Sequence, residues 1–185
     1  MHANYQDLAR FEVPPGFRGR SGFVVQLWWL VQAMLVNTSP QAFYGWRAFW
    51  WRVFGAKLGR GARIRSSARV CYPWKVSMGD YCWLGDRAEL YSLDNITIGN
   101  NVCISQDAYI CTGSHNVASR EFSYDCRPIV IEDEAWVAAG AFVGPGVTIG
   151  RAAVLAARSV TMKSLDGLGI YAGQPARFIR KRVEP

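Results

Sequence analysis

Aliphatic residues recur at every sixth position through most of this chain. The series runs from Leu58 to Ile110 with two longer steps of eight residues, pauses for 21 residues, and resumes from Ile131 to Leu155. A hexad places one inward side chain on each short strand, and three hexads close one triangular coil whose backbone pairs with the next coil. The repeat therefore predicts a parallel β-helix of about five coils over residues 58–166. Its inward positions are Leu58, Ile64, Val70, Met78, Leu84, Leu90, Ile98, Ile104, Ile110, Ile131, Val137, Val143, Ile149 and Leu155.

The two longer steps have a common cause. A small residue or valine stands four places after most of the aliphatic residues of the repeat. The exceptions are Trp74 and Asp94, and both lie within the two longer steps. Small residues fit tight corners, so two consecutive exceptions one coil apart predict an enlarged corner on the same side of successive coils.

The segment before the repeat, residues 1–57, has a different character. Residues 1–16 predict a poorly ordered or draped arm, and the almost wholly apolar residues 22–36 predict a helix. A second helix is predicted between Ser39, a good N-cap, and Gly55, a typical C-terminal stop, with aromatic residues recurring at helical spacing. Two interpretations of these aromatic-rich helices remain open. They pack on the rest of the fold or at a subunit interface, or they dock on a membrane surface.

Charge is distributed unevenly along the chain. The formal net charge is +7, from 21 Lys+Arg and 14 Asp+Glu. Residues 1–69 carry about +8, residues 70–157 about −5 and residues 158–185 about +4. An acidic centre between basic ends differs from the single basic stripe of nucleic-acid-binding proteins, so no nucleic-acid partner is expected. The basic C-terminal tail, residues 167–185, suits an anionic ligand instead.

The cysteines indicate a reducing compartment. They are odd in number and form no CxxC pair, which disfavours both a disulfide framework and a structural zinc site. The polar N-terminus does not resemble a secretory signal, and the longest apolar stretch, 23–36, is too short to span a bilayer. We therefore expect a cytoplasmic protein whose thiols are free, at Cys71, Cys82, Cys103, Cys111 and Cys126.

The pause in the hexads predicts a loop over residues 113–129. Long loops on rigid scaffolds commonly carry function. This one opens with Gly113-Ser114-His115-Asn116, and the only other histidine is His2. Two histidines cannot build the three-histidine zinc site of the γ-class carbonic anhydrases, so no metal is expected. An imidazole with an ordinary pKa of about 6.5 suits general-base chemistry at neutral pH.

The repeat and the loop resemble the hexapeptide-repeat transferases over about residues 55–182. Gly-Ser-His at the start of the loop is similar to the galactoside, maltose and related sugar O-acetyltransferases, where a catalytic histidine occupies this place. The resemblance implies a left-handed β-helix, with His115 as general base in direct transfer from acetyl-CoA to a sugar hydroxyl in a ternary complex. Glu121 or Asp125 would orient the imidazole, and a covalent mechanism through Cys111 and His115 is the alternative.

Residues 129–182 resemble the acetyl-CoA half of these enzymes, with Ala172-Gly173-Gln174-Pro175-Ala176-Arg177 as the terminal signature. The resemblance implies a homotrimer with the CoA groove between neighbouring subunits. Met162 stands where the family often has threonine, which removes one hydroxyl contact. The implied CoA contacts are Trp136 beside the thioester arm, the backbone of Ala139 and Ala157 on the pantetheine, and Lys163, Arg177 and Arg180 on the phosphates.

The acceptor side is less specific. The candidates for hydrogen bonds to sugar hydroxyls lie about one coil before His115 in the sequence. They are Glu89, Asp94 and Asn100. The Trp-rich helices and the corners at 72–76 and 92–96 are most similar to the colanic-acid-type acetyltransferases of exopolysaccharide clusters. That similarity implies a saccharide acceptor, lipid-linked sugars included, and contact of the N-terminal helices with the inner face of the membrane. A different acceptor (serine, a sugar amine or an antibiotic) and a non-catalytic β-helix scaffold are the alternatives.

Overall fold

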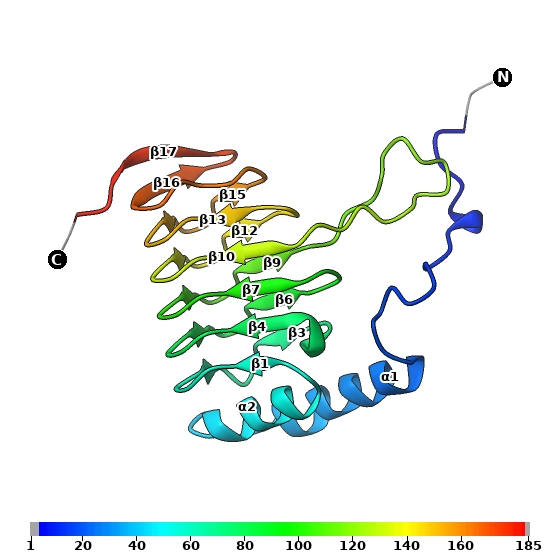
Figure 1. Ribbon diagram of the computed structural model, residues 1–185, viewed down its shortest axis with the longest axis horizontal. Coiled ribbons are helices and arrows are strands. Elements are labelled where there is room, and N and C mark those ends of the chain that lie inside the picture. The colour runs from blue at the N-terminus through cyan, green and yellow to red at the C-terminus, as the bar shows by residue number, and fades with distance from the viewer. Residues whose placement is uncertain (1–3, 184–185) are drawn as a thin grey trace.

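The computed structural model describes residues 4–183, and its body is a three-sided parallel β-helix (Figure 1). Three sheets, called A, B and C in chain order, form the sides, and each full coil contributes one strand to each sheet. Sheet A contains β1 (Lys57–Leu58), β4 (Val76–Met78), β7 (Ile96–Ile98), β10 (Ile129–Ile131) and β13 (Thr148–Ile149). Sheet B contains β2 (Arg63–Ile64), β5 (Trp83–Leu84), β8 (Cys103–Ile104), β11 (Trp136–Val137), β14 (Val154–Leu155), β16 (Gly169–Gly173) and β17 (Ala176–Lys181). Sheet C contains β3 (Arg69–Val70), β6 (Glu89–Tyr91), β9 (Tyr109–Cys111), β12 (Phe142–Val143) and β15 (Val160–Thr161).

The inward hexad positions fill the lumen of the β-helix. Leu84 pairs in register with Ile104, Ile104 with Val137, and Val137 with Leu155, and all four side chains are buried. Five complete coils are followed by a partial sixth, so the helix has about six turns. The expected β-helix is confirmed. It is longer than the hexads indicate because β16 pairs with β14 and the antiparallel β17 extends sheet B further.

The enlarged corner lies between sheets C and A. It holds the 3-10 turn η3 (Pro73–Lys75) in the first coil, and in the third coil it gives rise to the long arm between β9 and β10. The N-terminal segment, with its 3-10 turn η1 (Leu8–Arg10), runs beside this corner. Trp74 Nε1 donates to the Arg18 carbonyl at 2.7 Å, and Lys75 Nζ donates to the Phe17 carbonyl at 2.7 Å. The corner thus anchors the segment that leads into the helices.

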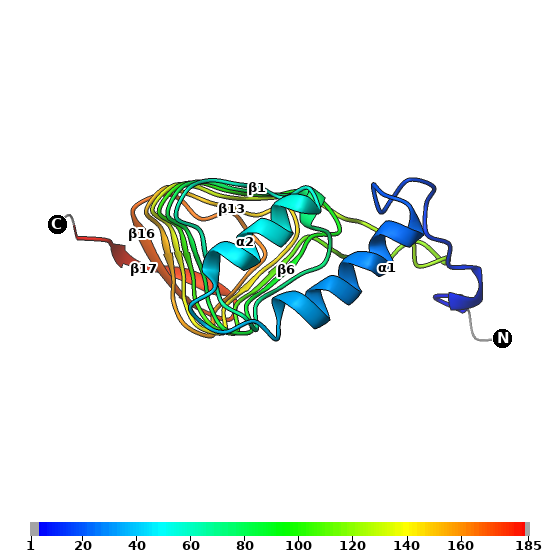
Figure 2. The ribbon, with the colours of Figure 1, turned by 90° about the horizontal axis from the view of Figure 1, so that it is seen from below.

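Two helical segments close the open end of the first coil (Figure 2). α1 (Gly22–Val31) continues directly into the π-helical turn η2 (Gln32–Val36), and α2 (Tyr44–Val53) lies across the lumen. Trp28 and Trp51 are fully buried there, with ring centroids 6.5 Å apart. Trp28 Nε1 also donates to the carbonyl of Val70 at 3.0 Å. Packing of both helices on the β-helix is therefore confirmed.

The start of α2 differs from the prediction. The helix begins at Tyr44 rather than after Ser39, and no side chain caps it. Ser39 Oγ instead donates to the Val36 carbonyl at 2.6 Å and accepts from Arg47 at 2.9 Å. Arg47 is fully buried and binds the carbonyls of the connecting loop, so the loop is held by a side chain one helical turn into α2. The predicted stop is confirmed: Gly55 has φ +98°, and its N–H donates to Arg52 O.

Candidate active site

The arm between β9 and β10 is a two-stranded antiparallel ribbon that projects from the corner of sheets C and A (Figure 1). Its strands are joined by bonds from Asp125 N to Ser114 O and from Arg127 N to Thr112 O, at 2.8 and 3.0 Å. The N-terminal segment packs on it, with the Phe17 ring stacked on Tyr124 at 4.3 Å. The predicted loop is therefore an ordered arm.

His115 lies in the first strand of this arm, paired with Tyr124, and its imidazole is held on several sides. Its Nδ1 is 2.6 Å from the carbonyl oxygen of Phe122. The ring stacks on Phe122 at 3.9 Å and on Tyr124 at 4.9 Å, and Phe11 contacts it edge-on at 5.8 Å. Because a carbonyl can only accept, Nδ1 carries the proton and Nε2 keeps its lone pair. No group among residues 4–183 hydrogen-bonds to Nε2, so this atom is available as a base.

The two carboxylates expected to orient the imidazole do not do so. Asp125 pairs with Arg127 at 3.0 Å, and Glu121 accepts a bond from Ser119 Oγ at 3.2 Å. The expectation of a carboxylate partner was wrong: Tyr124 is the residue paired with His115 in the antiparallel ribbon, and the carbonyl of Phe122, two residues earlier, reaches the imidazole. A carbonyl fixes the tautomer as a carboxylate would, without adding a second charge.

Cys111 is not arranged as a nucleophile. Its thiol is buried and donates to the Gly113 carbonyl at 3.3 Å. Burial raises the pKa of the Cys111 thiol, which disfavours the thiolate that a Cys–His mechanism requires. These contacts argue against the covalent alternative.

Two of the three acceptor candidates lie on the same side of the β-helix as the arm. Glu89 is an outward position of sheet C, in register between Arg69 and Tyr109. Asp94 lies directly below the base of the arm, where its N–H donates to Thr112 Oγ1 at 2.8 Å. Asn100 belongs instead to the corner between sheets A and B. The main-chain N–H of Asp80 donates to its Oδ1 at 2.9 Å, and its Nδ2 donates to Asp133 at 3.3 Å, so the structure gives it a role in holding that corner.

The candidate CoA residues gather mainly along sheet B and its corner with sheet C. Trp136 points outward from β11, is 45% exposed, and donates from Nε1 to Ser105 Oγ at 2.9 Å. Ala139 and Ala157 occupy the same corner one coil apart, joined by a bond from Arg158 N to Ala139 O. Within the described chain, the N–H groups of both alanines lack an acceptor, so both can donate to a ligand.

The candidate phosphate ligands divide between two places. Arg177 and Arg180 are exposed on β17, beside Ala172 and Ile170 of β16, and so extend the sheet B side. Lys163 is exposed at the opposite edge of sheet C, where its backbone is tied to Thr161 Oγ1. One chain therefore does not bring Lys163 to the two arginines, and it does not bring His115 to Trp136.

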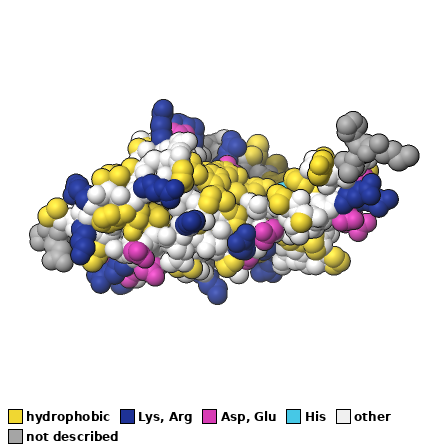
Figure 3. All heavy atoms as spheres, turned by 90° about the horizontal axis from the view of Figure 1, so that it is seen from above, with side chains coloured by type: hydrophobic (Ala, Val, Ile, Leu, Met, Phe, Trp, Pro, Cys, Tyr) yellow, Lys and Arg dark blue, Asp and Glu magenta, His cyan; other side chains and the backbone are white. Residues whose placement is uncertain are grey.

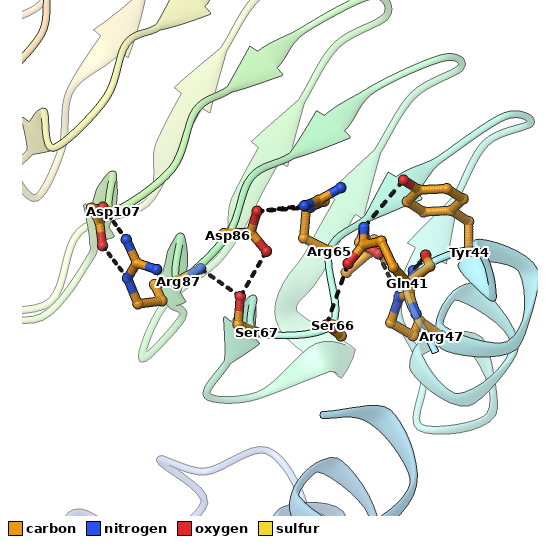
Figure 4. Close-up of polar contacts among 10 residues, drawn as sticks. Gln41, Tyr44, Arg47, Arg65, Ser66, Ser67, Asp86, Arg87 and Asp107 are labelled. Atoms are coloured by element: carbon orange, nitrogen blue, oxygen red, sulfur yellow. Dashed lines mark hydrogen bonds and ion pairs between the residues drawn. The ribbon is translucent and has the colours of Figure 1, made fainter. Parts of the chain in front are cut away.

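Sequence reasoning missed a groove on sheet B, just below Trp136. The cavity has a volume of about 530 Å³ and lies against α2. Arg65 Nε donates to Asp86 at 2.8 Å, and the Arg87 fork binds Asp107 at 2.7 Å (Figure 4). The Arg63 guanidinium lies 5.1 Å from the centre of the Trp83 ring. The signal was present: Arg63, Trp83, Cys103 and Trp136 each precede an inward aliphatic residue and so share one outward column. The groove is lined by Tyr44, Arg63, Arg65, Trp83, Leu84, Gly85, Asp86, Arg87, Cys103, Ile104, Ser105 and Gln106.

Comparison with known proteins identifies the family. The chain is 52% identical over 179 residues to the colanic acid biosynthesis acetyltransferase WcaF of Escherichia coli, covering 97% of this chain and 98% of that protein. This chain belongs to the WcaF family of hexapeptide-repeat acetyltransferases. It is also 26% identical over 129 residues to the galactoside O-acetyltransferase of E. coli, covering 68% of this chain and 64% of that enzyme. No family model matches it.

Solved structures show the same fold. A hexapeptide-repeat acetyltransferase from Vibrio cholerae superimposes with a TM-score of 0.82 at 22% identity, covering 96% of this chain and 98% of that one. A galactoside acetyltransferase solved with coenzyme A gives a TM-score of 0.79 at 20% identity, covering 93% and 85%. The β-helix with preceding helices is thus a shared architecture, and membership of the family makes this chain an acetyltransferase.

Proposed function

We propose that this enzyme transfers the acetyl group of acetyl-CoA to a hydroxyl of a saccharide in exopolysaccharide biosynthesis. The observation that supports this most directly is the fixed imidazole of His115, with Nδ1 bonded to Phe122 O and Nε2 free to accept a proton. Such a base takes the proton from an acceptor hydroxyl as its oxygen attacks the thioester carbonyl. The carbon–sulfur bond then breaks, and the proton held on Nε2 passes to the departing thiolate.

The CoA site of this proposal is the outer side of sheet B. Exposed Trp136 offers an apolar surface to the pantetheine, and the free N–H groups of Ala139 and Ala157 offer donors to its amide carbonyls. Arg177 and Arg180 place positive charge at the end of that side, where the phosphates of CoA require it. A backbone N–H of a neighbouring coil would bind the developing oxyanion.

The proposal includes a homotrimer. His115 stands on the corner of sheets C and A, whereas Trp136 and Ala139 belong to sheet B and its corner with sheet C. A single chain holds the base and the CoA surface apart, so a neighbouring copy has to bring the second half of each site. The acceptor would then meet Glu89 and Asp94 on the side of the arm. Five free cysteines are compatible with the reducing cytoplasm, where acetyl-CoA is made.

The test is acetyl-CoA turnover, measured as thiol release, with a panel of saccharide acceptors. His115→Ala should lower acceptor-dependent release by about 10²–10⁴-fold, the usual contribution of a general base. Glu121→Ala is the matched control, because Glu121 is exposed on the same arm and should leave turnover near wild type. Equal activity of His115→Ala and Glu121→Ala would disprove the assignment of the base. If serine or an antibiotic stimulates thiol release and no saccharide does, the acceptor is not a saccharide but belongs to the class that stimulates release.

A further inference from the structure

The outer side of the helical cap is strongly apolar. Ten of the 23 large hydrophobic side chains that are exposed within residues 4–183 fall between positions 23 and 53. They include Phe23 at 77% exposure, Met34 at 61% and Phe49 at 52%. We call this surface the cap face; it consists of Phe23, Leu27, Trp29, Leu30, Met34, Leu35, Phe43, Trp46, Phe49 and Val53.

The cap face is not residual core. The inner side of the same helices is already occupied by Val25, Trp28, Val36 and Trp51, all fully buried against the first two coils. A helix that is apolar on every side needs a second apolar environment. The two helices lie on the outside of the first coil (Figure 2), and their exposed apolar side chains provide a second contact surface.

The charges on the chain segment that carries the cap face are of one sign. Residues 13–79 contain ten Lys and Arg and no Asp or Glu. Three of these basic side chains are exposed and form no ion pair within the described chain: Arg20, Arg52 and Lys57. Arg20 lies just before α1, Arg52 in the last turn of α2, and Lys57 in β1. A second copy of the same face would oppose these charges with like charges, whereas an anionic surface would neutralise them.

The opposite end of the β-helix differs. Seen from that end, Asp and Glu side chains are interspersed with Lys and Arg (Figure 3). That end therefore carries both signs of charge, unlike residues 13–79.

We propose that the cap face docks on the surface of an anionic phospholipid bilayer. Among residues 4–183, no helix is long and apolar enough to cross a membrane. α1, η2 and α2 would lie in the plane of the interface instead, with apolar side chains among the acyl chains and arginines at the headgroups. Trp29 and Trp46 are suited to this depth because indole rings favour the membrane–water boundary.

Docking would bring the sheet B groove close to the lipid. Tyr44 of α2 lines that groove, and the same helix carries Trp46, Phe49 and Val53 of the cap face. An acceptor saccharide attached to a lipid would then reach the active site without leaving the membrane. This last step rests on the proposed function, but the docking itself does not.

The test is flotation of the full-length protein with phospholipid vesicles. We expect it to float with vesicles of phosphatidylcholine and phosphatidylglycerol at 3:1 and much less with pure phosphatidylcholine. Phe23→Ser combined with Phe49→Ser should weaken binding at least tenfold. Phe178→Ser is the control, since Phe178 has a similar exposure of 56% on β17 at the other end of the molecule.

Two results would overturn the docking proposal. One is failure of the wild-type protein to float with either vesicle. The other is equal flotation of the wild-type protein and the double variant; a change in the oligomeric mass of that variant, measured by sedimentation, would then make the cap face an interface between copies. Turnover with a soluble acceptor should stay unchanged in the double variant, so failure here is distinguishable from failure of the proposed acetyl transfer.

Discussion

Replacing Arg47 tests how the helical cap is attached to the β-helix. This guanidinium is fully buried. It donates to the Ile64 carbonyl at 2.6 Å, Ser39 Oγ at 2.9 Å, the Pro40 carbonyl at 2.8 Å and the Gln41 carbonyl at 2.6 Å. It therefore ties α2, the loop before it and the first coil together with one side chain (Figure 4).

The magnitude follows from opposing contributions. Four bonds from a charged donor represent roughly 6–12 kcal/mol, at about 1.5–3 kcal/mol each. Burying the charge costs several kcal/mol, and the same burial lowers the pKa of Arg47. We expect Arg47→Met to destabilise the protein by about 3–5 kcal/mol, because it keeps the apolar stem but leaves buried carbonyls without a donor. Arg47→Lys should recover little of this, since one ammonium cannot reach all four acceptors.

The assay is equilibrium urea unfolding followed by far-UV circular dichroism at one protein concentration. Arg52→Met is the matched control, because Arg52 lies on the same helix and donates to the carbonyls of Leu58 and Gly59 but is exposed. Its unfolding midpoint should stay close to wild type. An Arg47→Met midpoint equal to that of Arg52→Met would refute the reasoning, since the buried bonds would then contribute nothing net.

Three further predictions concern the β-helix. A Cβ at Gly85 would overlap the backbone of Gln106 in the next coil, so Gly85→Ala should lower the melting temperature sharply. Gly22→Ala is the control and should not lower it, because a Cβ at Gly22 meets open space. Equal melting curves of the two variants would contradict the close packing of the coils. Burial raises the pKa of Cys71 to about 11, which leaves only about one thiolate in a thousand at pH 8, so mass spectrometry should find Cys71 alkylated far more slowly than Cys103 on the outside of sheet B. Hydrogen bonds from Arg87 lower the pKa of Asp107 in the folded protein. The ionised carboxylate therefore stabilises the fold above about pH 4, and this stabilisation is lost as the pH falls further. The fall of the urea midpoint between pH 5 and pH 3 should accordingly be smaller in Asp107→Asn, and an identical fall would exclude this pair as a contributor.

The hexads were sufficient to determine the β-helix from sequence. A strand of two or three residues has one inward side chain, so the spacing of Ile98, Ile104 and Ile110 fixes which residues face the lumen before any coil is built. Local rules also placed the stop at Gly55 and the enlarged corner, because both depend on residues close together in the chain. The position of His115 at the start of a loop followed from the same interruption of the repeat.

What the sequence did not determine depends on contacts between distant coils. The start of α2 was mispredicted because Arg47 binds carbonyls on both sides of it, and a local N-cap rule does not include such a contact. The partner of His115 is the Phe122 carbonyl rather than Glu121 or Asp125, because the way the arm folds back on itself decides which atom reaches the imidazole. The sheet B groove and the exposure of the cap face were decided in the same way: each depends on how residues from separate coils and helices are stacked, and only the tertiary structure sets that stacking.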